Sequence, residues 1–442
     1  MNALLIPRFA TVQGSVRLPG SKSIANRVLL LSALTRQRTR IQNLPLADDI
    51  LVLLRNLLDL GFPIEDDQAR HLDFNQVLQA VTRRQDLWLK GDPDRFDCQR
   101  PITLQLDNAG TALRPLVAVL ATRRGSYIID GNEQMRRRPI QDLVTALQRL
   151  GCQIEATAGC PPVRLEARGL KGGKIEMSGQ VSSQFISAML MAAPFMQEGL
   201  TIRLPADPVS KPYIDLSISL LRQFDAAVKR DGWRSFQVQA APLRAPECIT
   251  VEGDATAATY FLAAGALPGS GPVRIEGLGS ASIQGDIAFC DLLQRMGAAV
   301  NLEAGSITIE GPPAGTRLRA LDVDMNAMPD AAMTLAVLAL FADGESHIRN
   351  IANLRVKESE RIQGLRIELE KLGARVIEEP DALHISPPMT LRPASIETYK
   401  DHRMAMAFAL AAYGTDVTIL DPGCVSKTYT AFFDDFLPLC RS

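Results

Sequence analysis

Six apolar runs, each introduced by a few polar residues, recur along the chain and constrain its fold more than any other feature. Their openings lie near Ser23, Gly110, Ser183, Ala255, Asp330 and Asp401, so consecutive runs begin 71 to 87 residues apart. A strand-like phrase follows each run, and the six phrases are TRIQNL, SYIIDG, LTIRLP, VRIEGL, SHIRNI and DVTILD. Self-similarity of this kind is the sequence signature of a repeated structural unit. We therefore expect six copies of one unit, each beginning with an apolar helix.

A second helical pattern follows each strand phrase and is more polar and amphipathic than the first. In four copies this pattern ends in a glycine, at Gly61, Gly151, Gly297 and Gly373. Glycine adopts the left-handed conformation that commonly ends a helix. The third copy lacks the glycine, and the sixth copy is shortened. Each unit is therefore predicted to run helix, strand, helix, strand, with room for further strands in the longer gaps.

Chain length decides how the units are grouped. A chain of 442 residues is too long for one ordinary core and fits about two to three domains. Six units form either one solenoid or two clusters of three, and the proline-containing stretch Ala240–Glu247 is the best linker candidate. We favour two domains of three units each.

The overall charge and the cysteines exclude whole classes of function. The chain has 48 basic and 49 acidic side chains and a net charge of −1, so it has no general attraction for nucleic acid or an anionic membrane. MNALLIPRFA is too short for a signal sequence, and no apolar run reaches the length of a membrane span. Seven cysteines without a CxxC pair indicate reduced thiols rather than a zinc site or disulfides. We expect a cytoplasmic protein without a metal and without nucleic-acid or membrane partners.

The polar openings contain most of the candidate chemistry, and the strongest local signal is LPGSKSIANR. Lys22 and Arg27 lie in the first turns of the predicted helix, and Ser21 or Ser23 is expected to cap it. Free N–H groups at a helix start, together with hydroxyls and two cations, suit a phosphate or a carboxylate. The alternative is an ordinary capped helix with two solvated cations.

The second opening, DNAGTALRP, repeats the idea with a neutral helix start. Asn108 precedes Gly110, and a glycine there lets a ligand approach the backbone closely. Arg114, one turn further on, is either a ligand-binding residue or a structural partner. Arg138 in MRRRP stands before Pro139, the predicted N1 residue of the next helix, although three consecutive arginines are also typical of a solvated face.

The third opening, GQVSSQF, offers neutral hydrogen-bonding groups. Ser182, Ser183 and Gln184 suit the hydroxyls or phosphate of a small polar ligand, and capping alone explains only one of the serines. In the nearby VSKPYID, Ser210 and Tyr213 flank a helix that begins at a proline. Tyr213 is equally compatible with an amphipathic core position.

In the C-terminal half the pattern becomes catalytic. NLRVKESERI places Lys357, Glu358 and Arg361 within five residues at a predicted helix start. Lys357 and Arg361 are four residues apart, are expected to share a helix face, and repel each other unless an anion or a carboxylate lies between them. Glu358 is placed to exchange a proton. A capping box or surface ion pairs are the alternative explanation of the glutamate.

Three further polar residues accompany the last two apolar runs. Asp330 follows Pro329 and is expected to cap the fifth apolar helix, so capping alone would explain it. Arg403 in DHRMAM stands at the sixth helix start, and the neighbouring His402 is expected to be a hydrogen-bonded structural residue. Lys427 in VSKT adds another cation before the last helix. The fourth opening, VEGDATAA, is assigned no ligand.

Together these segments resemble the 5-enolpyruvylshikimate-3-phosphate synthases (3-phosphoshikimate 1-carboxyvinyltransferases) of the enolpyruvyl transferase family. LPGSKSIANR, DNAGTALRPL, VSSQF, SKPYID, MPDAAM, RVKESERI, DHRMAM and VSKT occur in the family's order and span nearly the whole chain. The resemblance implies an α/β (α+β) fold of two similar domains, each of three βαβαββ units with inward-pointing helices. It places the active site in the cleft between a domain of residues 21–247 and a second domain of residues 1–20 and 248–442.

The resemblance also implies a reaction. The enolpyruvyl group of phosphoenolpyruvate is transferred to the 5-hydroxyl of shikimate 3-phosphate through a tetrahedral intermediate, and phosphate is released. The reaction belongs to the biosynthesis of chorismate and aromatic amino acids. No metal or organic cofactor is expected, the partners are the two small substrates, and the chain is expected to be a monomer.

The family's functional residues map onto matching positions of this sequence. Shikimate 3-phosphate is expected to bind Lys22, Ser23, Arg27, Ser182, Ser183, Gln184, Ser210, Asp330, Asn353 and Lys357. Phosphoenolpyruvate is expected to bind Lys22, Gly110, Arg138, Gln184, Arg361, Arg403 and Lys427. The catalytic residues are expected to be Asp330 as the base toward the attacking hydroxyl, Glu358 as the proton donor and acceptor at the methylene carbon, and Lys22.

Two rival functions share part of this pattern. UDP-N-acetylglucosamine enolpyruvyltransferases have the same fold and donor, but they normally carry Lys-Asn after the first strand and a reactive loop cysteine. Here the pair is Lys22-Ser23, and no cysteine lies in an equivalent glycine-rich loop. A non-catalytic anion-binding protein would keep the cationic helix starts but would need neither Asp330 nor Glu358. Gly110 and Pro115 match the form of the family that is sensitive to glyphosate, an analogue that occupies the phosphoenolpyruvate site.

Overall fold

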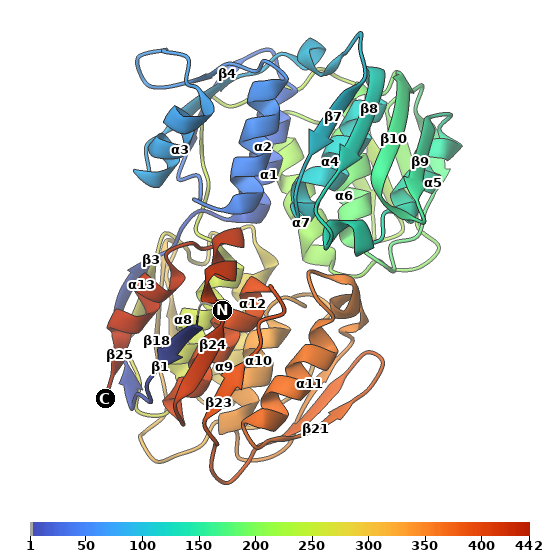
Figure 1. The fold of residues 1–442 in the computed structure, drawn as a ribbon. Coiled ribbons are helices and arrows are strands. Elements are labelled where there is room, and N and C mark those ends of the chain that lie inside the picture. Colours follow the sequence, from blue (N-terminus) through green and yellow to red (C-terminus); the bar gives the residue numbers. More distant parts are fainter. Residues whose placement is uncertain (1–2) are drawn as a thin grey trace. The chain divides into compact units, whose positions relative to one another are not determined.

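The chain folds into two compact units in the computed structural model, which describes residues 3–442 (Figure 1). The continuous unit consists of Gly20–Val251. The split unit consists of Met1–Pro19 together with Glu252–Ser442. Each unit is described by itself below.

The six apolar runs are helices, as predicted. They are α1 (Lys22–Ala33), α4 (Gly110–Ala121), α6 (Ser183–Ala192), α8 (Ala255–Ala266), α10 (Ala332–Leu338) and α12 (His402–Phe408). In α8, α10 and α12 every residue is buried, and in α1, α4 and α6 nearly every one is. A helix that is surrounded by protein on all sides needs no polar face. This explains why the runs are apolar and small throughout rather than amphipathic.

The strand phrases and the second helices are also where the sequence predicts them. The strands are β4 (Arg38–Gln42), β8 (Arg124–Asp130), β12 (Leu200–Arg203), β16 (Val273–Glu276), β20 (Ser346–Arg349) and β24 (Val417–Leu420). The helices that follow them are α2 (Asp48–Asp59), α5 (Gln141–Arg149), α7 (Lys211–Gln223), α9 (Phe289–Met296), α11 (Arg361–Lys371) and α13 (Phe432–Phe436).

Glycine ends the second helices through its backbone conformation. Gly61, Gly151, Gly297 and Gly373 have φ values of 84°, 87°, 111° and 99°, in the left-handed region. The predicted helix ends are therefore confirmed. In the third repeat, which lacks the glycine, Asp225 occupies the equivalent place after α7 with φ 60°.

The second and third repeats show the complete unit. In the second, β7 (Ile102–Gln105) runs parallel to β8, and the hairpin of β9 (Gln153–Thr157) and β10 (Cys160–Arg168) completes a sheet of order β7-β8-β10-β9. The third repeats this order with β11 (Gly173–Glu176), β12, β14 (Ser235–Val238) and β13 (Val228–Asp231). Both repeats are βαβαββ units, as expected.

The sheet of the first repeat includes a strand from the C-terminal end of the continuous unit. Its sheet has the order β15-β4-β6-β5, with β5 (Ile64–Glu65), β6 (Leu87–Lys90) and the additional helix α3 (Phe74–Thr82) between them. The outer strand β15 (Cys248–Thr250) follows the third repeat in sequence, and its Ile249 lies opposite Ile41 of β4. Because this pairing keeps residues 248–251 in the continuous unit, the chain leaves the unit after Val251 rather than after residue 247.

In the split unit, the sheet of the fourth repeat likewise includes a strand that is distant in sequence, here from the N-terminal segment. The sheet of the fourth repeat has the order β17-β18-β16-β3, with β17 (Ala299–Leu302) and β18 (Ser306–Glu310). Its outer strand β3 (Gly14–Arg17) comes from the N-terminal segment, and Val16 lies opposite Ile275. The fifth repeat forms the sheet β19-β20-β22-β21 from β19 (Asp322–Asp324), β21 (Arg375–Glu378) and β22 (Leu383–Ser386).

The sixth repeat differs from the others because the chain ends soon after α13. Its sheet has the order β1-β24-β23, in which β23 (Ala394–Ile396) is parallel to β24 and β1 (Ala3–Ile6) is antiparallel to it. A short pairing of β2 (Thr11–Val12) with β25 (Cys440–Arg441) holds the C-terminal end. Among the described residues, 3–442, no helix is both long and apolar enough to cross a membrane.

Candidate active site

The helix starts of the continuous unit form the first group of predicted site residues. Helix α1 packs against α4, and α4 packs against α6. Near the starts, the Asn26 side chain donates to the Thr111 hydroxyl (2.7 Å), and Arg114 of α4 donates to the Gln184 side chain of α6. The first residues of α1, α4 and α6 are therefore held close to one another.

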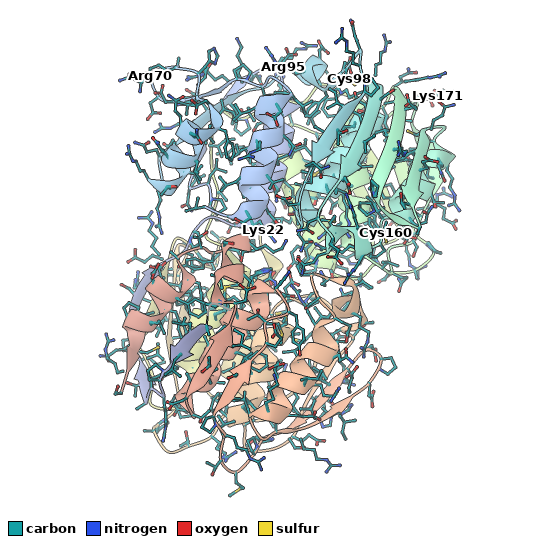
Figure 2. The ribbon with its side chains drawn as sticks, viewed as in Figure 1. Lys22, Arg70, Arg95, Cys98, Cys160 and Lys171 are labelled. Atoms are coloured by element: carbon teal, nitrogen blue, oxygen red, sulfur yellow. The ribbon has the colours of Figure 1, made fainter. Side chains whose placement is uncertain are left out.

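Lys22 is the first residue of α1 (Figure 2) and is buried. Its Nζ lies 3.1 Å from an Oδ of Asp49, near the start of α2. The sequence analysis missed Asp49, although an acidic residue in the first turn of a helix was a visible signal. The predicted side-chain cap does not form: Ser21 is the N-cap, its hydroxyl makes no cap hydrogen bond, and Ser23 lies inside the helix.

Arg27 points from α1 toward α7. Its guanidinium donates to the Ser217 hydroxyl and to the Ser23 carbonyl, both at 2.8 Å. Burial lowers the pKa of Arg27 to about 10, against a raising effect of Tyr213, and the group remains charged at neutral pH. No carboxylate pairs with this guanidinium within residues 3–442. A buried cation in such surroundings favours an anionic ligand.

Gly110, the first residue of α4, lies against two guanidinium groups. A methyl group added at Gly110 would be 3.0 Å from Arg114 Nη1 and 3.1 Å from Arg138 Nη2. Arg138 is buried and donates to the side-chain and backbone oxygens of Asn108 (3.0 and 3.3 Å). Helix α5 begins at Gln141, so the predicted N1 role of Pro139 is wrong. Arg138 is thus a positioned side chain rather than part of a solvated face.

The third helix start holds a serine cap and an oriented glutamine. The hydroxyl of Ser182 accepts from the backbone N–H of Gln184 (3.2 Å) and caps α6, while Ser183 is buried in its first turn. The side-chain oxygen of Gln184 accepts from Arg114, which also donates to the Pro139 carbonyl (3.1 Å). These contacts give Arg114 a structural role, because it orients a predicted site residue.

Ser210 has the most unusual backbone in this group. It is buried, precedes α7 and has φ 54° and ψ 46°, a left-handed conformation that non-glycine residues rarely adopt. Such strain persists only where surrounding structure imposes it, and it clusters at functional sites. The Ser210 carbonyl accepts from the N–H of Tyr213 (3.1 Å).

In the split unit, the predicted residues gather around Arg361. This first residue of α11 is 1% exposed, and its guanidinium contacts three carboxylates. It lies 2.7 Å from Asp401 Oδ2, 2.8 Å from Asp330 Oδ1 and 2.9 Å from Glu358 Oε2. Burial opposes its charge, but Asp401, Glu358 and Asp330 raise the pKa of Arg361 above its ordinary value.

Asp330 pairs with cations instead of capping a helix. The N-cap of α10 is Ala331, which forms no side-chain cap, so the expected capping role is wrong. Asp330 lies 3.0 Å from Arg403 and 3.8 Å from Lys357, besides its contact with Arg361. Burial acts to raise its pKa, but the three cations outweigh burial and hold the pKa of Asp330 well below its usual range.

A carboxylate relieves the repulsion anticipated between Lys357 and Arg361, which is one of the two alternatives that the sequence left open. Asp330 lies between them, with one oxygen near both cations. The two residues do not share a helix face, because α11 begins at Arg361 and Lys357 follows the 3₁₀ helix η6 (Ala352–Val356). Asn353 lies within η6 and is buried.

Glu358 is held between two cations. Its Oε2 accepts from Arg361, and its Oε1 lies 3.9 Å from Lys427, the buried last residue of η8 (Pro422–Lys427). The glutamate that caps α11 is Glu360 rather than Glu358, because the Glu360 carboxylate accepts a hydrogen bond from the backbone N–H of Gln363 (2.9 Å). Glu358 is thereby left for another role.

Asp401 is a buried residue of this group that was not selected from the sequence. It caps α12 by accepting from the N–H of Arg403 (3.0 Å), and it also accepts from Arg361 and from the Ser359 hydroxyl (3.0 Å). Its position directly before His402 and Arg403 in DHRMAM was the available signal. His402 itself is fully buried beside Asp401, with Nδ1 3.5 Å from the carboxylate.

The fourth helix start contributes to this group although the sequence analysis assigned it no ligand. Tyr260 of α8 accepts a hydrogen bond from Arg403 (3.3 Å), and burial raises the pKa of Tyr260 to about 12 against the effect of Arg403. Asp286, in η4 (Gly285–Ala288), accepts from the Thr256 hydroxyl (3.0 Å). Burial and the charge of Asp330 raise the pKa of Asp286 to about 6, again against Arg403.

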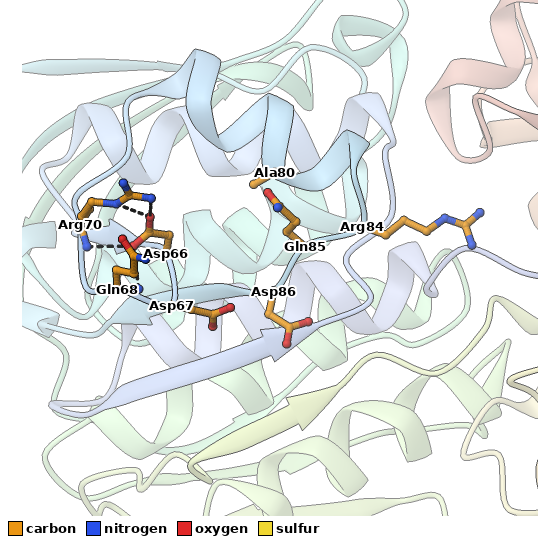
Figure 3. A pocket seen from close by; sticks show the side chains of 8 residues that line it. All are labelled: Asp66, Asp67, Gln68, Arg70, Ala80, Arg84, Gln85 and Asp86. Carbon is orange, nitrogen blue, oxygen red and sulfur yellow. Dashed lines mark hydrogen bonds and ion pairs between the residues drawn. The ribbon is translucent and has the colours of Figure 1, made fainter.

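A separate pocket of the continuous unit contains none of the predicted site residues. It has a volume of about 450 Å³ and is lined by Asp66, Asp67, Gln68, Arg70, Ala80, Arg84, Gln85 and Asp86 (Figure 3). Arg70 donates to Asp66 (2.7 Å) within it and lowers the pKa of that carboxyl. Because acidic and basic side chains already pair there, the pocket presents no anion site comparable to the helix starts.

The chain is similar to known proteins over nearly its whole length. The sequence model of one family, EPSP synthase (3-phosphoshikimate 1-carboxyvinyltransferase), matches residues 7–436. A curated 3-phosphoshikimate 1-carboxyvinyltransferase from Thiobacillus denitrificans is 46% identical over 446 residues, which covers 100% of each chain. The chloroplastic 3-phosphoshikimate 1-carboxyvinyltransferase 1 of Nicotiana tabacum is 43% identical, over 98% of this chain and 84% of that protein.

Solved structures share the fold. An EPSP synthase from Acinetobacter baumannii superimposes with a TM-score of 0.78 at 22% identity, over 100% of this chain and 98% of that one. The enolpyruvyl transferase NikO from Streptomyces tendae gives a TM-score of 0.77 at 22% identity, over 99% and 97% of the two chains. At this level of identity the likeness concerns the architecture alone.

Proposed function

Because the chain belongs to the EPSP synthase family, we propose that its two groups of polar side chains serve one enolpyruvyl transfer. The chain is an enzyme of aromatic amino acid biosynthesis that transfers the enolpyruvyl group of phosphoenolpyruvate to shikimate 3-phosphate. Each substrate brings a phosphate and a carboxylate. The protein must therefore surround several anionic groups with fixed cations and donors, and this requirement decides the roles proposed below.

Shikimate 3-phosphate is bound mainly by the helix starts of the continuous unit. The proposed residues are Lys22, Ser23, Arg27, Ser182, Ser183, Gln184 and Ser210, joined by Asp330, Asn353 and Lys357. The buried Arg27, whose described contacts are neutral oxygens, supports this assignment because a dianionic phosphate would supply the missing charge. The capped start of α6 supports it with oriented neutral donors.

Phosphoenolpyruvate is bound mainly by arginines and lysines that other side chains already orient. The proposed residues are Lys22, Gly110, Arg138, Gln184, Arg361, Arg403 and Lys427. The contacts of Arg138 with Asn108, of Gln184 with Arg114 and of Arg403 with Tyr260 support this assignment. Donors held in place before the reaction stabilise the departing phosphate without reorganising. Glyphosate is expected to compete with phosphoenolpyruvate for these groups.

The acid and base are Asp330 and Glu358. Asp330 accepts the proton of the 5-hydroxyl of shikimate 3-phosphate. The oxygen of that hydroxyl bonds to C2 of phosphoenolpyruvate, and C3 takes a proton from the protonated carboxyl group of Glu358. The tetrahedral intermediate then loses phosphate as the C2–O bond to the phosphate breaks and C3 returns a proton to Glu358. Lys22 assists by neutralising the phosphate that departs.

The strongly lowered pKa of Asp330 bears on this role. A carboxylate with three cations beside it is ionised but only weakly basic. Substrate phosphate and carboxylate groups compete for Arg403 and Lys357, and their binding draws positive charge away from Asp330. The basicity of Asp330 is therefore expected to increase when the substrates bind, which couples proton transfer to an occupied site.

One observation carries the proposal: a single buried guanidinium, Arg361, holds both proposed proton-transfer groups in place. The test measures phosphate release from phosphoenolpyruvate with shikimate 3-phosphate or UDP-N-acetylglucosamine as acceptor. Turnover is expected only with shikimate 3-phosphate. Turnover only with the nucleotide sugar, or with neither acceptor, contradicts the function.

The proton-transfer roles need a separate readout. In D₂O the wild-type enzyme is expected to incorporate deuterium at C3 of phosphoenolpyruvate during turnover. Glu358→Gln should abolish this incorporation together with product formation, while shikimate 3-phosphate still binds. Unchanged incorporation in Glu358→Gln contradicts the assignment of Glu358.

We propose further that the enzyme acts as a cytoplasmic monomer. All seven cysteines are free thiols, which supports a reducing compartment, and every proposed site residue is carried by one chain. Light scattering coupled to size-exclusion chromatography should give the mass of one chain, and cell fractionation should recover the activity in the cytosol.

A further inference from the structure

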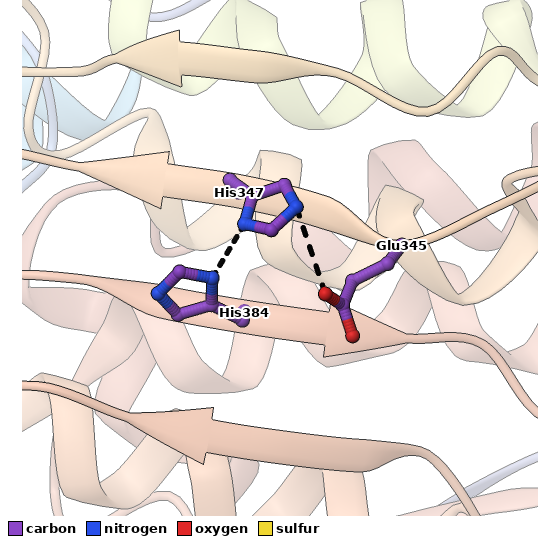
Figure 4. Close-up of side chains that lie close together, drawn as sticks. All are labelled: Glu345, His347 and His384. Atoms are coloured by element: carbon purple, nitrogen blue, oxygen red, sulfur yellow. Dashed lines mark hydrogen bonds and ion pairs between the residues drawn. The ribbon is translucent and has the colours of Figure 1, made fainter.

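Two of the four histidines form a cross-strand pair on the sheet of the fifth repeat (Figure 4). His347 of β20 lies directly opposite His384 of β22. Glu345 precedes His347 by two residues, and its carboxylate lies beside the pair. None of these three residues belongs to the two groups described above.

Both ring nitrogens of each histidine face a polar group. The Nδ1 atoms of His347 and His384 face each other in direct contact. The opposite ring nitrogens face carboxylates: His347 Nε2 lies 3.6 Å from Glu345 Oε1, and His384 Nε2 lies 3.2 Å from Glu379 Oε1. A carboxylate beside Nε2 favours a proton on that nitrogen, and a neutral imidazole carries only one.

The two Nδ1 atoms that face each other share either a hydrogen bond, in which one of them carries a proton, or a bridging metal ion. With both protons on Nε2, each Nδ1 presents a lone pair, and the lone pairs repel unless a proton or a metal ion bridges them. A proton would give one charged imidazolium shared by the pair. A metal ion would use both lone pairs, and the exposed Glu345 carboxylate, which faces His347 Nε2, would turn toward the ion to complete the site.

The surroundings favour a metal ion. One ligand atom from each of Glu345, His347 and His384 lies within 4.8 Å of the others, and Glu345 is exposed and therefore reached from solvent. The Ser386 hydroxyl donates to the second oxygen of Glu345, which orients the carboxylate in the manner of a supporting residue around a metal. The two negative charges of Glu345 and Glu379 exceed the single positive charge of Arg375, which is the nearby cation that acts on Glu345.

We propose that Glu345, His347 and His384 bind one divalent transition-metal ion, with Zn²⁺ as the representative probe. Two imidazole nitrogens and a carboxylate oxygen are a donor set that Zn²⁺ and its neighbours in the first transition row accept, with water in the remaining position. The ion ties β20 to β22. Since β20 leads toward the segment that carries Asn353, Lys357 and Glu358, the metal stabilises the support of that segment without touching it.

The test uses the full-length protein, Zn²⁺ titration calorimetry and thermal unfolding. We expect one Zn²⁺ per chain and a rise in Tm of about 5–10 °C when free Zn²⁺ exceeds its Kd a hundredfold. His347→Gln or His384→Gln should weaken binding at least tenfold and abolish the rise in Tm. Ser386→Ala removes only the hydrogen bond that orients the Glu345 carboxylate, and it should weaken Zn²⁺ binding about tenfold.

His71→Gln is the matched control, because His71 also lies beside a glutamate, Glu65 (3.7 Å), but has no second histidine opposite it. This variant should bind Zn²⁺ like the wild type. Co²⁺ bound to the wild type should give an absorption spectrum without thiolate charge-transfer bands, which separates this site from the cysteines.

The proposal is overturned if no stoichiometric Zn²⁺ binds, or if binding persists in both histidine variants. It is also overturned if the two imidazoles titrate as a proton-sharing pair by NMR and their signals do not respond to Zn²⁺. These outcomes leave enolpyruvyl transfer undecided, because no proposed substrate-binding residue belongs to the site.

Discussion

Arg361 shows how a buried charge is used at the scale of single residues. Its guanidinium is surrounded by Asp330, Glu358 and Asp401, and such buried pairs contribute little net stability because desolvation offsets their attraction. Removing one partner costs far more, since a buried charge is then left uncompensated. We interpret the cluster as a device for holding carboxylates in position rather than as a source of stability.

Asp330→Asn is expected to lower kcat by about 10²–10⁴-fold, the usual contribution of a general base. The amide keeps the shape of the carboxyl but accepts no proton, and it no longer balances Arg403 and Lys357. Steady-state kinetics with both substrates saturating measure the effect. Asp322→Asn, an exposed change in the same unit, should keep wild-type kcat. A less than fivefold loss in the Asp330 variant would contradict the role of base.

Asp286 predicts a pH dependence of stability. Its pKa of about 6 in the folded state is above the unfolded value of about 3.9. The stability that it contributes is therefore complete below about pH 4 and is lost as the pH rises through 6. Asp286→Asn removes this loss and should stabilise the protein at pH 7.5 by on the order of 1–3 kcal/mol.

Urea unfolding between pH 4 and 8 measures this effect of Asp286. The difference between wild type and variant should grow with pH up to about 7 and then stay constant. The exposed Asp231→Asn is the control and should show no such trend. A variant that is less stable than the wild type at pH 7.5 would mean that Asp286 acts as a needed partner of Arg403.

At the scale of secondary-structure elements, helix ends followed local sequence more closely than helix starts did. Gly61, Gly151, Gly297 and Gly373 all end or follow their helices in the left-handed conformation. That preference is intrinsic to glycine, because in other residues the contact of Cβ with the backbone raises the free energy of the left-handed conformation. The starts involve side chains, and Asp330 shows the difference: it turns from its own helix to three distant cations, since their charge outweighs a single capping bond.

Gly297→Ala is expected to destabilise the split unit by about 1–2 kcal/mol, because alanine at φ 111° is strained although nothing lies within 4 Å of the new methyl group. Gly305→Ala is the matched control. It also meets open space but has no positive φ, so its effect should stay within about 0.5 kcal/mol. Urea denaturation of both variants measures the difference, and equal effects would contradict the conformational explanation.

At the scale of the whole molecule, the chain passes from one unit to the other twice, after Pro19 and after Val251. The N-terminal strand β3 completes the sheet of the fourth repeat, and β15, which follows the third repeat, completes the sheet of the first. Each unit therefore contains a strand distant in sequence from its neighbours. Closing such long loops costs chain entropy, which many backbone hydrogen bonds and buried side chains offset.

Matched substitutions on β3 and β15 should each loosen a different unit. Val16→Asp on β3 buries a charge against Ile275 and is expected to increase hydrogen exchange in the split unit alone. Ile249→Asp on β15 does the same against Ile41 and should affect only the continuous unit. Hydrogen-exchange mass spectrometry locates the change. The pairing of β3 with β16 and of β15 with β4 is contradicted if both variants increase hydrogen exchange in the same unit.

The sequence by itself determined the six repeats, their apolar helices, their strands and the glycine helix ends, because these follow from periodicity and local backbone preference. It also indicated that Lys357 and Arg361 need an anion or a carboxylate between them, since repulsion between neighbours is a local property. Only the tertiary structure decided that Asp330 is this carboxylate, that Asp49 pairs with Lys22 and that Asp401 holds Arg361. Each of these pairs joins segments that are distant in the sequence, and no spacing along the chain encodes how one helix start packs against another.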